Sequence, residues 1–208
     1  IDRVAAFDQG DGLYTGEQSF LDWRDQSYSK WILDDIASLG SSKSLSTNAG
    51  HYQALLLASQ LAKELGHETS MARYLGWAHE LKNAINEILW LEDEGLYSSL
   101  TAGHMDGTPM KKFDWLGQSL AIITGIASDD RAKKIMASYP HSPMGPPVIF
   151  PQQPDISIYH NRAIWPFVTA YGLRAATKVK SCDVANRAIL SLVRGAALNL
   201  SNMENFEW

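Results

Sequence analysis

The sequence predicts an all-α protein built from antiparallel helical hairpins. Apolar residues recur at helical spacing in successive stretches, as in Leu75, Ala78, Leu81 and Ile85. Residues that begin or end helices bound these stretches, and Gly66 is one such stop. Short connections join them, and nothing resembles the alternation of strand and helix that a parallel sheet requires. These three observations favour helices packed on helices.

Seven helices are expected after an N-terminal loop of residues 1–19. For the first helix, Asp25 and Ser27 are good N-cap residues and Gly40 is a natural stop. Pro166 suits the first turn of a later helix, because its missing N–H is not needed there. The expected helices are Ser27–Leu39, a second that follows the loop 40–48 and ends at Leu65, Ser70–Trp90, Asp114–Gly125, Ser128–Tyr139, Pro166–Lys178 and Asp183–Leu200.

The last of these helices is apolar nearly all round, which predicts that other elements cover most of its sides. Two long segments lack helical periodicity. Residues 91–112 read as an irregular β-hairpin or a functional loop, with Asp106-Gly107 as the turn. Residues 140–161 contain six prolines and are not expected to be helical. A connection of that length inside a compact domain is usually functional.

Composition excludes several classes of function. The formal net charge is −5 and no Lys/Arg run occurs, so neither nucleic acid nor an anionic membrane surface is an expected partner. No apolar run approaches the roughly 18 residues of a membrane span. With a single cysteine, Cys182, and no His-Glu-x-x-His pattern, no metal is expected. Nucleotide-binding and dinucleotide-binding glycine motifs are missing, so no cofactor is expected.

The residues most suggestive of chemistry lie near position 25. Asp22, Trp23, Arg24, Asp25 and Gln26 bring acids, a guanidinium, an amide and an indole to a helix start. Cleavage of a glycosidic bond needs one carboxyl group as proton donor and a second as base or nucleophile. An acid beside tryptophans would be partly desolvated, which raises its pKa. The alternative is an ordinary capped helix start anchored by a tryptophan.

The second carboxylate must come from elsewhere in the chain. Glu204 and Glu207 are the leading candidates, because they lie in a polar, aromatic tail after an apolar helix, while Glu17, Asp114 and Asp155 remain possible. Asp114 also fits a plain N-cap.

Two further clusters precede or begin helices, where amide and imidazole groups suit sugar hydroxyls. The expected substrate-binding residues are Trp23, Arg24, Gln26, Asn48, His51, Tyr52, His160, Asn161 and Trp165. Ordinary capping and packing is the alternative for both clusters.

Four blocks, in order, resemble the six-hairpin (α/α)6-barrel glycosidases, bacterial members similar to the trehalase, glucosidase and debranching-type families in particular. The blocks are Asp22-Trp-Arg-Asp-Gln-Ser27, Ser46-Thr-Asn-Ala-Gly-His-Tyr-Gln-Ala-Leu55, Phe113-Asp-Trp-Leu-Gly-Gln-Ser-Leu-Ala121 and Tyr159-His-Asn-Arg-Ala-Ile-Trp-Pro-Phe167. The resemblance implies an (α/α)6 toroid with a sugar pocket at one end of its inner helices. It also implies a general acid at Asp25, or at Asp22, and a base at Glu204 or Glu207. Inversion of the anomeric centre would follow, with the two carboxyl groups about 6.5–9.5 Å apart.

A full ring of this kind has twelve helices, whereas this sequence predicts about seven. We therefore expect residues 1–208 to form a single but incomplete α/α-toroid catalytic domain, a segment of a longer one. A missing segment or a second chain would complete the ring, or a large apolar surface would remain exposed.

The expected function is that of a glycoside hydrolase acting on a glycoside or oligosaccharide. Two alternatives keep the toroid. A sugar epimerase, isomerase or polysaccharide lyase would use His51 or His160 with a tyrosine, and a non-catalytic toroid would only bind carbohydrate. The sequence leaves the compartment open, although a glycan-degrading role favours the periplasm or cell exterior by analogy.

Overall fold

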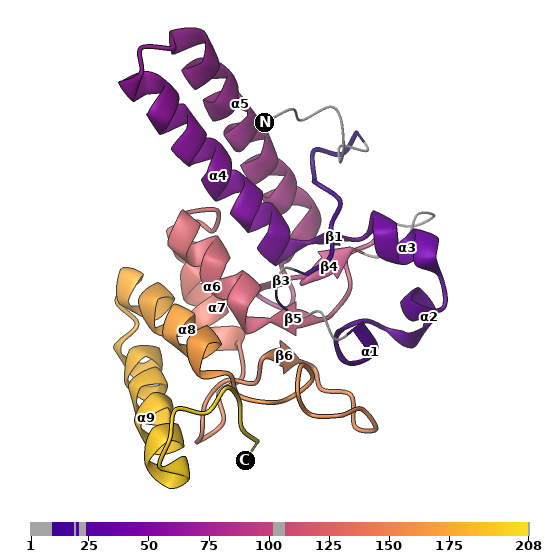
Figure 1. The fold of residues 1–208 in the computed structure, drawn as a ribbon, viewed down its shortest axis with the longest axis vertical. Helices are drawn as coiled ribbons and strands as arrows, with labels where there is room; N and C mark the ends of the chain where they lie inside the picture. Colours follow the sequence, from indigo (N-terminus) through magenta and orange to yellow (C-terminus); the bar gives the residue numbers. More distant parts are fainter. Residues whose placement is uncertain (1–9, 19, 21–23, 102–106, 208) are drawn as a thin grey trace.

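The computed structural model describes residues 10–18, 20, 24–101 and 107–207, and it is largely helical (Figure 1). Its α-helices are α1 (Arg24–Ser27), α2 (Lys30–Leu33), α3 (Ile36–Ser41), α4 (Leu45–Glu64), α5 (Glu68–Ala84), α6 (Trp115–Thr124), α7 (Asp129–Ser138), α8 (Pro166–Lys178) and α9 (Cys182–Asn199), and a π-helix, η1 (Ile85–Leu89), continues α5. Its short strands are β1 (Lys43–Ser44), β2 (Trp90–Leu91), β3 (Leu96–Tyr97), β4 (Leu100–Thr101), β5 (Phe113–Asp114) and β6 (Ile149–Phe150). The strands pair antiparallel as β1–β4, β2–β3 and β5–β6.

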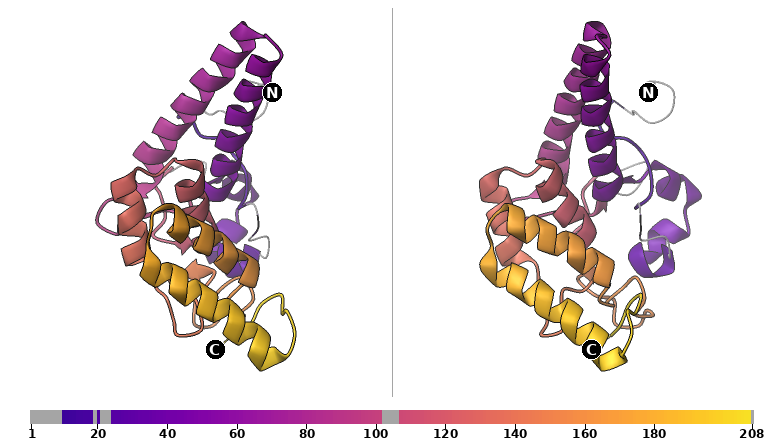
Figure 2. Two further views of the ribbon diagram at one scale, coloured as in Figure 1. Left: turned by 90° about the vertical axis from the view of Figure 1, so that its left-hand side faces the viewer. Right: turned by 60° about the vertical axis from the view of Figure 1, so that its left-hand side comes forward.

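Three consecutive hairpins, α4–α5, α6–α7 and α8–α9, form an arc. Helix α6 packs between α4 and α8, so these three helices make one row. Helices α5 and α9 pack chiefly on α4 and α8 and lie outside that row (Figure 2). An inner row with an outer helix after each member is the arrangement of an (α/α)6 toroid. The predicted fold class is confirmed, and the three hairpins correspond to half of a six-hairpin ring.

Close contact between inner helices depends on a glycine. Trp115, at the start of α6, is fully buried and faces Gly172 of α8. A Cβ atom at position 172 would lie 2.3 Å from Trp115 Nε1, which no side chain tolerates. The missing side chain therefore allows α8 to approach α6 closely.

Helix boundaries in the arc follow the predicted caps. The Asp114 side chain accepts a hydrogen bond from Gly117 N at the start of α6, and Ser128 does the same for Arg131 N in α7. Gly125 ends α6 in the left-handed conformation, with φ +83°. Pro166 is the first residue of α8, as expected. These local signals place α6, α7, α8 and α9 within about two residues of their predicted positions.

The single first helix predicted over Ser27–Leu39 is wrong. The chain breaks into α1, α2 and α3, and Tyr28 and Ile32 are buried in a small second core cluster with Leu39 and Leu100. The predicted caps are also wrong: Asp25 and Ser27 lie within α1, and Gly40 lies within α3. Asp35 caps α3 instead, accepting a hydrogen bond from Ala37 N.

The irregular segments follow expectation in part. Strands β2 and β3 form a hairpin within the predicted region, with its turn at residues 92–95. Thr101 also bridges antiparallel to Pro109, so a second reversal of the chain spans the predicted turn at Asp106-Gly107. Asp106 lies outside the described residues. The segment 140–161 is non-helical, as predicted, and carries β6.

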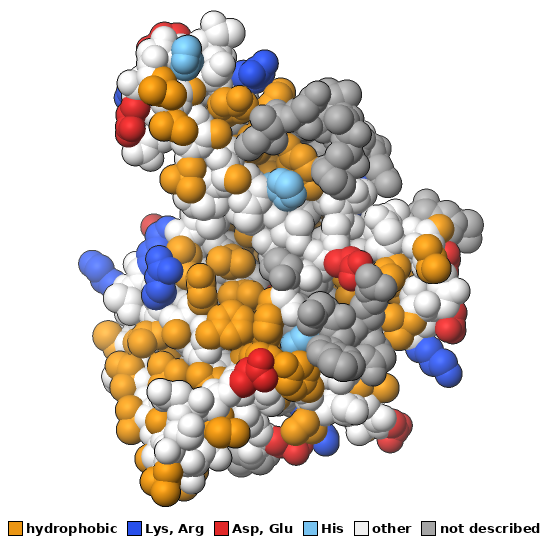
Figure 3. Space-filling view, viewed as in Figure 1, with side chains coloured by type: hydrophobic (Ala, Val, Ile, Leu, Met, Phe, Trp, Pro, Cys, Tyr) orange, Lys and Arg blue, Asp and Glu red, His pale blue; other side chains and the backbone are white. Residues whose placement is uncertain are grey.

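The prediction that the last helix is covered on most sides is wrong. Helix α9 packs on α8 and leaves Val193 59% and Leu198 73% exposed. Figure 3 shows apolar side chains over the α8 and α9 region at its lower left. Leu57 and Leu61 of α4, and Leu65 directly after it, are exposed at the other end of the arc. An exposed apolar surface was expected of an incomplete ring, and both ends of the arc carry one. In the described part of the chain, no helix combines the length and the apolar character needed to cross a membrane.

Candidate functional site

The candidate site lies along the rim formed by the N-terminal ends of α4, α6 and α8. These three inner helices run in the same direction, and β1 and β5 lead directly into α4 and α6 (Figure 1). Residues 159–165 lead into α8 and form the loop before α8. Helix starts present unpaired backbone N–H groups and capping side chains, so this rim collects polar groups from distant parts of the sequence.

Helix α1 is docked against the loop before α8. Gln26 is buried, and its side-chain Oε1 accepts a hydrogen bond of 2.7 Å from His160 N. Its backbone carbonyl accepts a second bond, of 3.1 Å, from Gln153 Nε2. The backbone of Asp25, one residue earlier, therefore lies beside the loop before α8. Four predicted side chains fall outside what the structure describes, namely Asp22, Trp23, Arg24 and Asp25.

An aromatic cluster forms the loop before α8. His160 and Trp165 are almost fully buried, at 2% and 3% exposure. Phe20 meets both rings edge-on, with centroids 4.9 Å from His160 and 4.8 Å from Trp165. Trp165 Nε1 donates a hydrogen bond to Tyr159 O. Asn161 is buried too, and its amide bonds to the backbone of residues 153 and 156. Packing thus holds this loop in one conformation.

The C-terminal tail is fixed to the same loop. Ile164 N donates to Phe206 O at 2.9 Å, and Phe206 N donates to Ile164 O at 3.1 Å. The Arg162 Nε atom lies 3.0 Å from Glu207 Oε1. Glu204 is exposed at the start of this segment. The regions of residues 25, 160 and 207, remote in sequence, therefore meet at one loop.

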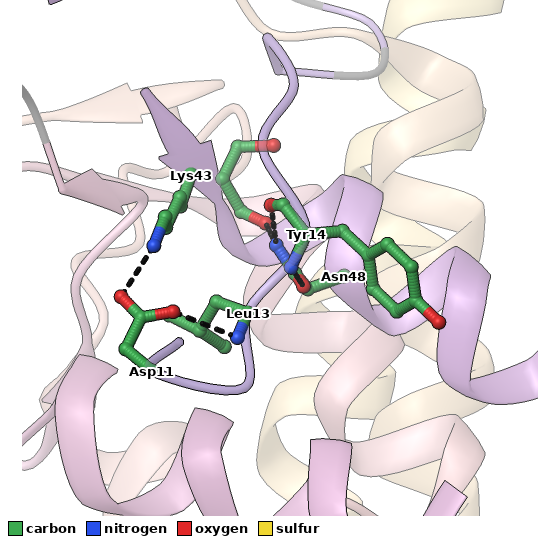
Figure 4. Close-up of polar contacts among 6 residues, drawn as sticks. Asp11, Leu13, Tyr14, Lys43 and Asn48 are labelled. Atoms are coloured by element: carbon green, nitrogen blue, oxygen red, sulfur yellow. Dashed lines mark hydrogen bonds and ion pairs between the residues drawn. The ribbon is translucent and has the colours of Figure 1, made fainter. Parts of the chain in front are cut away.

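The predicted cluster at the start of α4 holds a different segment. Asn48 is fully buried and clamps Tyr14, accepting from its N–H at 2.8 Å and donating to its carbonyl at 3.0 Å (Figure 4). His51 stacks on the Tyr14 ring with centroids 4.2 Å apart, and burial lowers the pKa of His51. Tyr52 is nearly buried, which raises its pKa. Lys43 pairs with Asp11 beside this clamp (Figure 4).

Asp114, one of the alternative carboxylates, is an N-cap and lies away from solvent. It is 1% exposed, and burial raises its pKa to about 7 against the opposing effect of the bond from Gly117 N. The Tyr139 side chain lies close enough for its own pKa to be raised, by burial first and then by the charge of Asp114. Its position suits a structural role rather than proton transfer to a substrate.

A cavity of about 480 Å³ adjoins the tail, and we call it the tail pocket. It is lined by Pro140, His141, Ser142, Pro147, Phe150, Gln152, Arg162, Ile164 and Glu207. Of the predicted residues whose side chains the structure describes, Glu207 alone lines it. The sequence singled out neither His141, Phe150 nor Gln152 of this lining, although the length of the proline-rich segment pointed to a function there. Within the described ranges, no group of three or more His, Cys, Asp or Glu residues is arranged to hold a metal.

Comparison with known proteins points to one class of enzyme. The family model described as "Mannosylglycerate hydrolase MGH1-like glycoside hydrolase domain" matches residues 13–206. Among curated proteins, none matches the sequence significantly.

Solved structures with a similar fold include neutral trehalase Nth1 from Saccharomyces cerevisiae, with TM-score 0.67 and 13% identity over 81% of this chain and 35% of that one. The GH63 mannosylglycerate hydrolase from Thermus thermophilus, solved with glucose, has TM-score 0.61 and 16% identity over 76% of this chain and 40% of that one. The GH78 rhamnosidase of Bacillus sp. GL1 has TM-score 0.58 and 15% identity over 95% of this chain and 18% of that one. The chain thus spans well under half the length of these similar structures. At such identities the likeness shows a common fold.

Proposed function

This chain belongs to the family of MGH1-like glycoside hydrolase domains, and from that membership we propose that it takes part in hydrolysing a glycosidic bond in a glycoside or short oligosaccharide. One observation carries the proposal beyond family membership. The Gln26–His160 hydrogen bond and the Ile164–Phe206 bridge attach α1 and the tail to the same loop. The two segments that contain the candidate carboxyl groups are therefore both attached to the loop before α8.

The proposed mechanism uses two carboxyl groups. Asp25 protonates the oxygen of the leaving group, with Asp22 as the alternative donor. Glu204 or Glu207 removes a proton from a water molecule that attacks the anomeric carbon. Such an inverting reaction requires the two carboxyl groups to lie about 6.5–9.5 Å apart. A separation of about 5 Å, or a product of retained anomeric configuration, would contradict this course.

The predicted binding residues divide into two groups. Trp23 and Arg24 are proposed to contact the sugar by ring stacking and hydrogen bonding. The others are buried or packed against protein groups, and we assign them the positioning of these contacts. This second group comprises Gln26, Asn48, His51, Tyr52, His160, Asn161 and Trp165.

The substrate is proposed to be a small glycoside. The similar proteins are a mannosylglycerate hydrolase, a trehalase and a rhamnosidase by their names. Residues 1–208 would form one catalytic domain with the rest of its ring. Exposed leucines of α4 and exposed apolar residues of α9 favour further hairpins at both ends of the arc, from a missing segment or a second chain.

Two substitutions separate hydrolysis from chemistry based on histidine. Turnover is measured by release of reducing sugar from a panel of α-linked disaccharides and mannosylglycerate. Asp25→Asn is expected to reduce the rate by about 10²–10⁴, the usual contribution of a general acid. Asp130→Asn, which changes an exposed carboxylate on α7, serves as the control and should keep the rate.

An enzyme indifferent to Asp25→Asn but inactive with His160→Ala would be an epimerase, isomerase or lyase instead. Since His160 is buried among aromatic rings, its substitution must be accompanied by an unfolding measurement. Sugar binding without turnover of any substrate would leave the non-catalytic alternative.

A further inference from the structure

A groove lies between α7 and α9, the second helices of two neighbouring hairpins. Helix α9 packs chiefly on α8, and α7 packs chiefly on β3, so α7 and α9 are not packed closely on one another. Three cavities of about 420, 340 and 250 Å³ line up there. The first shares Met136 and Val184 with the second, and the second shares His141 and Arg187 with the third. The three cavities therefore adjoin, and we call them together the α7–α9 groove.

Helical spacing places charged side chains along this groove. One face of α9 lines it with residues that are four, three and four positions apart, namely Asp183, Arg187, Leu190 and Arg194. Lys133 lines it from α7, and Lys180 lines it from the turn before α9. The side chains of Lys133 and Arg187 are 70% and 53% exposed, so both remain accessible to a ligand.

The α7–α9 groove is positively charged at neutral pH. Among the described residues of its lining, the charged ones are four cations and one carboxylate, namely Lys133, Lys180, Arg187, Arg194 and Asp183. Asp183 pairs with Arg187 at 3.0 Å, and Asp130, outside the lining, lies 4.0 Å from Lys133 Nζ. Burial, followed by the charge of Arg187, lowers the pKa of His141 to about 4, so its imidazole is neutral at pH 7. The groove thus keeps an excess of positive charge in a chain whose formal net charge is −5.

Apolar side chains lie between these cations. Met136 and Val184 are nearly buried, and Leu190 is 48% exposed. A ligand that matches this lining carries acidic and apolar groups together. Tyr139 lines the groove but is only 2% exposed, so its ring offers little stacking surface to a sugar.

A segment of polypeptide meets these requirements. Alternate side chains of an extended segment point to opposite sides, so acidic residues can face the cations while apolar residues face the lining between them. Neither ring nitrogen of His141 has a hydrogen-bond partner in the part of the chain that the structure describes, and backbone groups of a bound segment could supply one. From residue 183 to residue 194, α9 rises about 16 Å, the length of about five extended residues.

We propose that the α7–α9 groove binds a short, extended segment of another protein in which acidic and apolar residues alternate. The cations of α7 and α9 pair with its carboxylates, and Met136, Val184 and Leu190 contact its apolar side chains. This interaction does not depend on the proposed hydrolysis, so each can fail without the other.

Fluorescence anisotropy tests the interaction directly. The full chain is titrated into a fluorescein-labelled peptide, Gly-Glu-Leu-Glu-Leu-Glu-Gly, and into a second peptide with lysine in place of each glutamate. We expect saturable binding of the acidic peptide alone. Its affinity should fall about tenfold or more when salt is raised from about 0.1 M to about 1 M, because the Debye length shrinks from about 10 Å to about 3 Å. No saturable binding of the acidic peptide, or equal binding of both peptides, would overturn the proposal.

Variants at the two ends of the groove test whether one segment spans it. Lys133→Gln and Arg194→Gln should each weaken binding about threefold, as expected for an exposed ion pair, and the double variant about tenfold. Arg174→Gln, which changes an exposed cation of α8 outside the lining, is the matched control and should bind like the unchanged protein. Because Arg194 also donates a hydrogen bond to Pro143 O, urea unfolding of every variant is measured alongside.

Three other outcomes would refute the assignment. Unchanged affinity in both Lys133→Gln and Arg194→Gln would show that the peptide binds elsewhere. Weakening by Arg162→Met alone would place it in the tail pocket, which shares His141 with the groove. Saturable binding of tetragalacturonate but not of the acidic peptide would assign the groove to an acidic glycan instead.

Discussion

Replacing Gln26 with leucine removes the hydrogen bond that attaches α1 to the loop before α8. Leucine has a similar volume but no acceptor, so His160 N–H loses its partner in a site where Gln26 is only 5% exposed. Leaving a buried donor unpaired costs about 1–3 kcal/mol, and we expect the free energy of unfolding to fall by about 2 kcal/mol. The bond from Gln153 to the backbone of residue 26 is retained, so α1 should loosen rather than detach.

The same change should also lower kcat, because Asp25 directly precedes Gln26 and would move with α1. A displacement of about 1 Å at a reacting group can cost on the order of 10²-fold in rate. Equilibrium unfolding in urea and kcat on the best substrate are measured together. Gln60→Leu is the matched control, since Gln60 is exposed on α4 and its 3.4 Å bond to Glu64 contributes little.

Three results distinguish the possibilities. Loss of both stability and kcat in Gln26→Leu, with Gln60→Leu unaffected, supports the docking of α1 as the device that positions the acid. Loss of stability with kcat unchanged would show that Asp25 has no part in the reaction. Unchanged stability would refute the hydrogen bond itself.

The remaining predictions concern the fold that positions the site. Gly172→Ala should destabilise the protein by about 1–3 kcal/mol in urea unfolding, because its Cβ would meet the buried Trp115 ring, whereas Gly50→Ala, exposed in α4 with open space, should stabilise it by about 0.5–1 kcal/mol. A harmless Gly172→Ala would contradict the packing of α6 on α8, and a destabilising Gly50→Ala would contradict the open space around position 50. The pKa of Asp114 is raised to about 7 in the folded chain, so the folded state holds its proton more tightly, and its contribution to stability should be full below pH 4 and lost as the pH rises through 7. Asp114→Asn should flatten this decline in unfolding measurements between pH 4 and 8, and an unchanged pH profile would count against the raised pKa.

The hairpins of the arc were predictable because their signals are local. A cap at Ser128, a stop at Gly125 and a proline at position 166 act within one turn of the chain, and the structure keeps all three. The first helix was not predictable in this way. Helical spacing over residues 27–39 does not reveal the breaks after Ser27 and Leu33, and this segment packs on Leu100, which is distant in sequence.

The same distinction between local signals and long-range contacts applies to the candidate site. Residues around positions 25, 51, 160 and 205 were expected to meet at one rim. The hydrogen bonds of Gln26 and the tail bring the first, third and last of these regions to one loop, whereas His51 stacks on Tyr14 instead. The tail pocket escaped prediction because His141, Phe150 and Gln152 carry no motif and become neighbours only when β6 pairs with β5. The exposure of α9 was missed because an apolar sequence cannot report which neighbouring helices are present.

The sharpest measurement of the proposed mechanism compares two substrates in the Asp25→Asn variant. One is the glycoside that the protein cleaves best, and the other carries the same sugar on 2,4-dinitrophenol, a leaving group that needs no proton. If Asp25 is the proton donor, kcat should fall by about 10²–10⁴ for the first substrate and change little for the second. An equal fall for both substrates, or for neither, would contradict the assignment of Asp25 as the general acid.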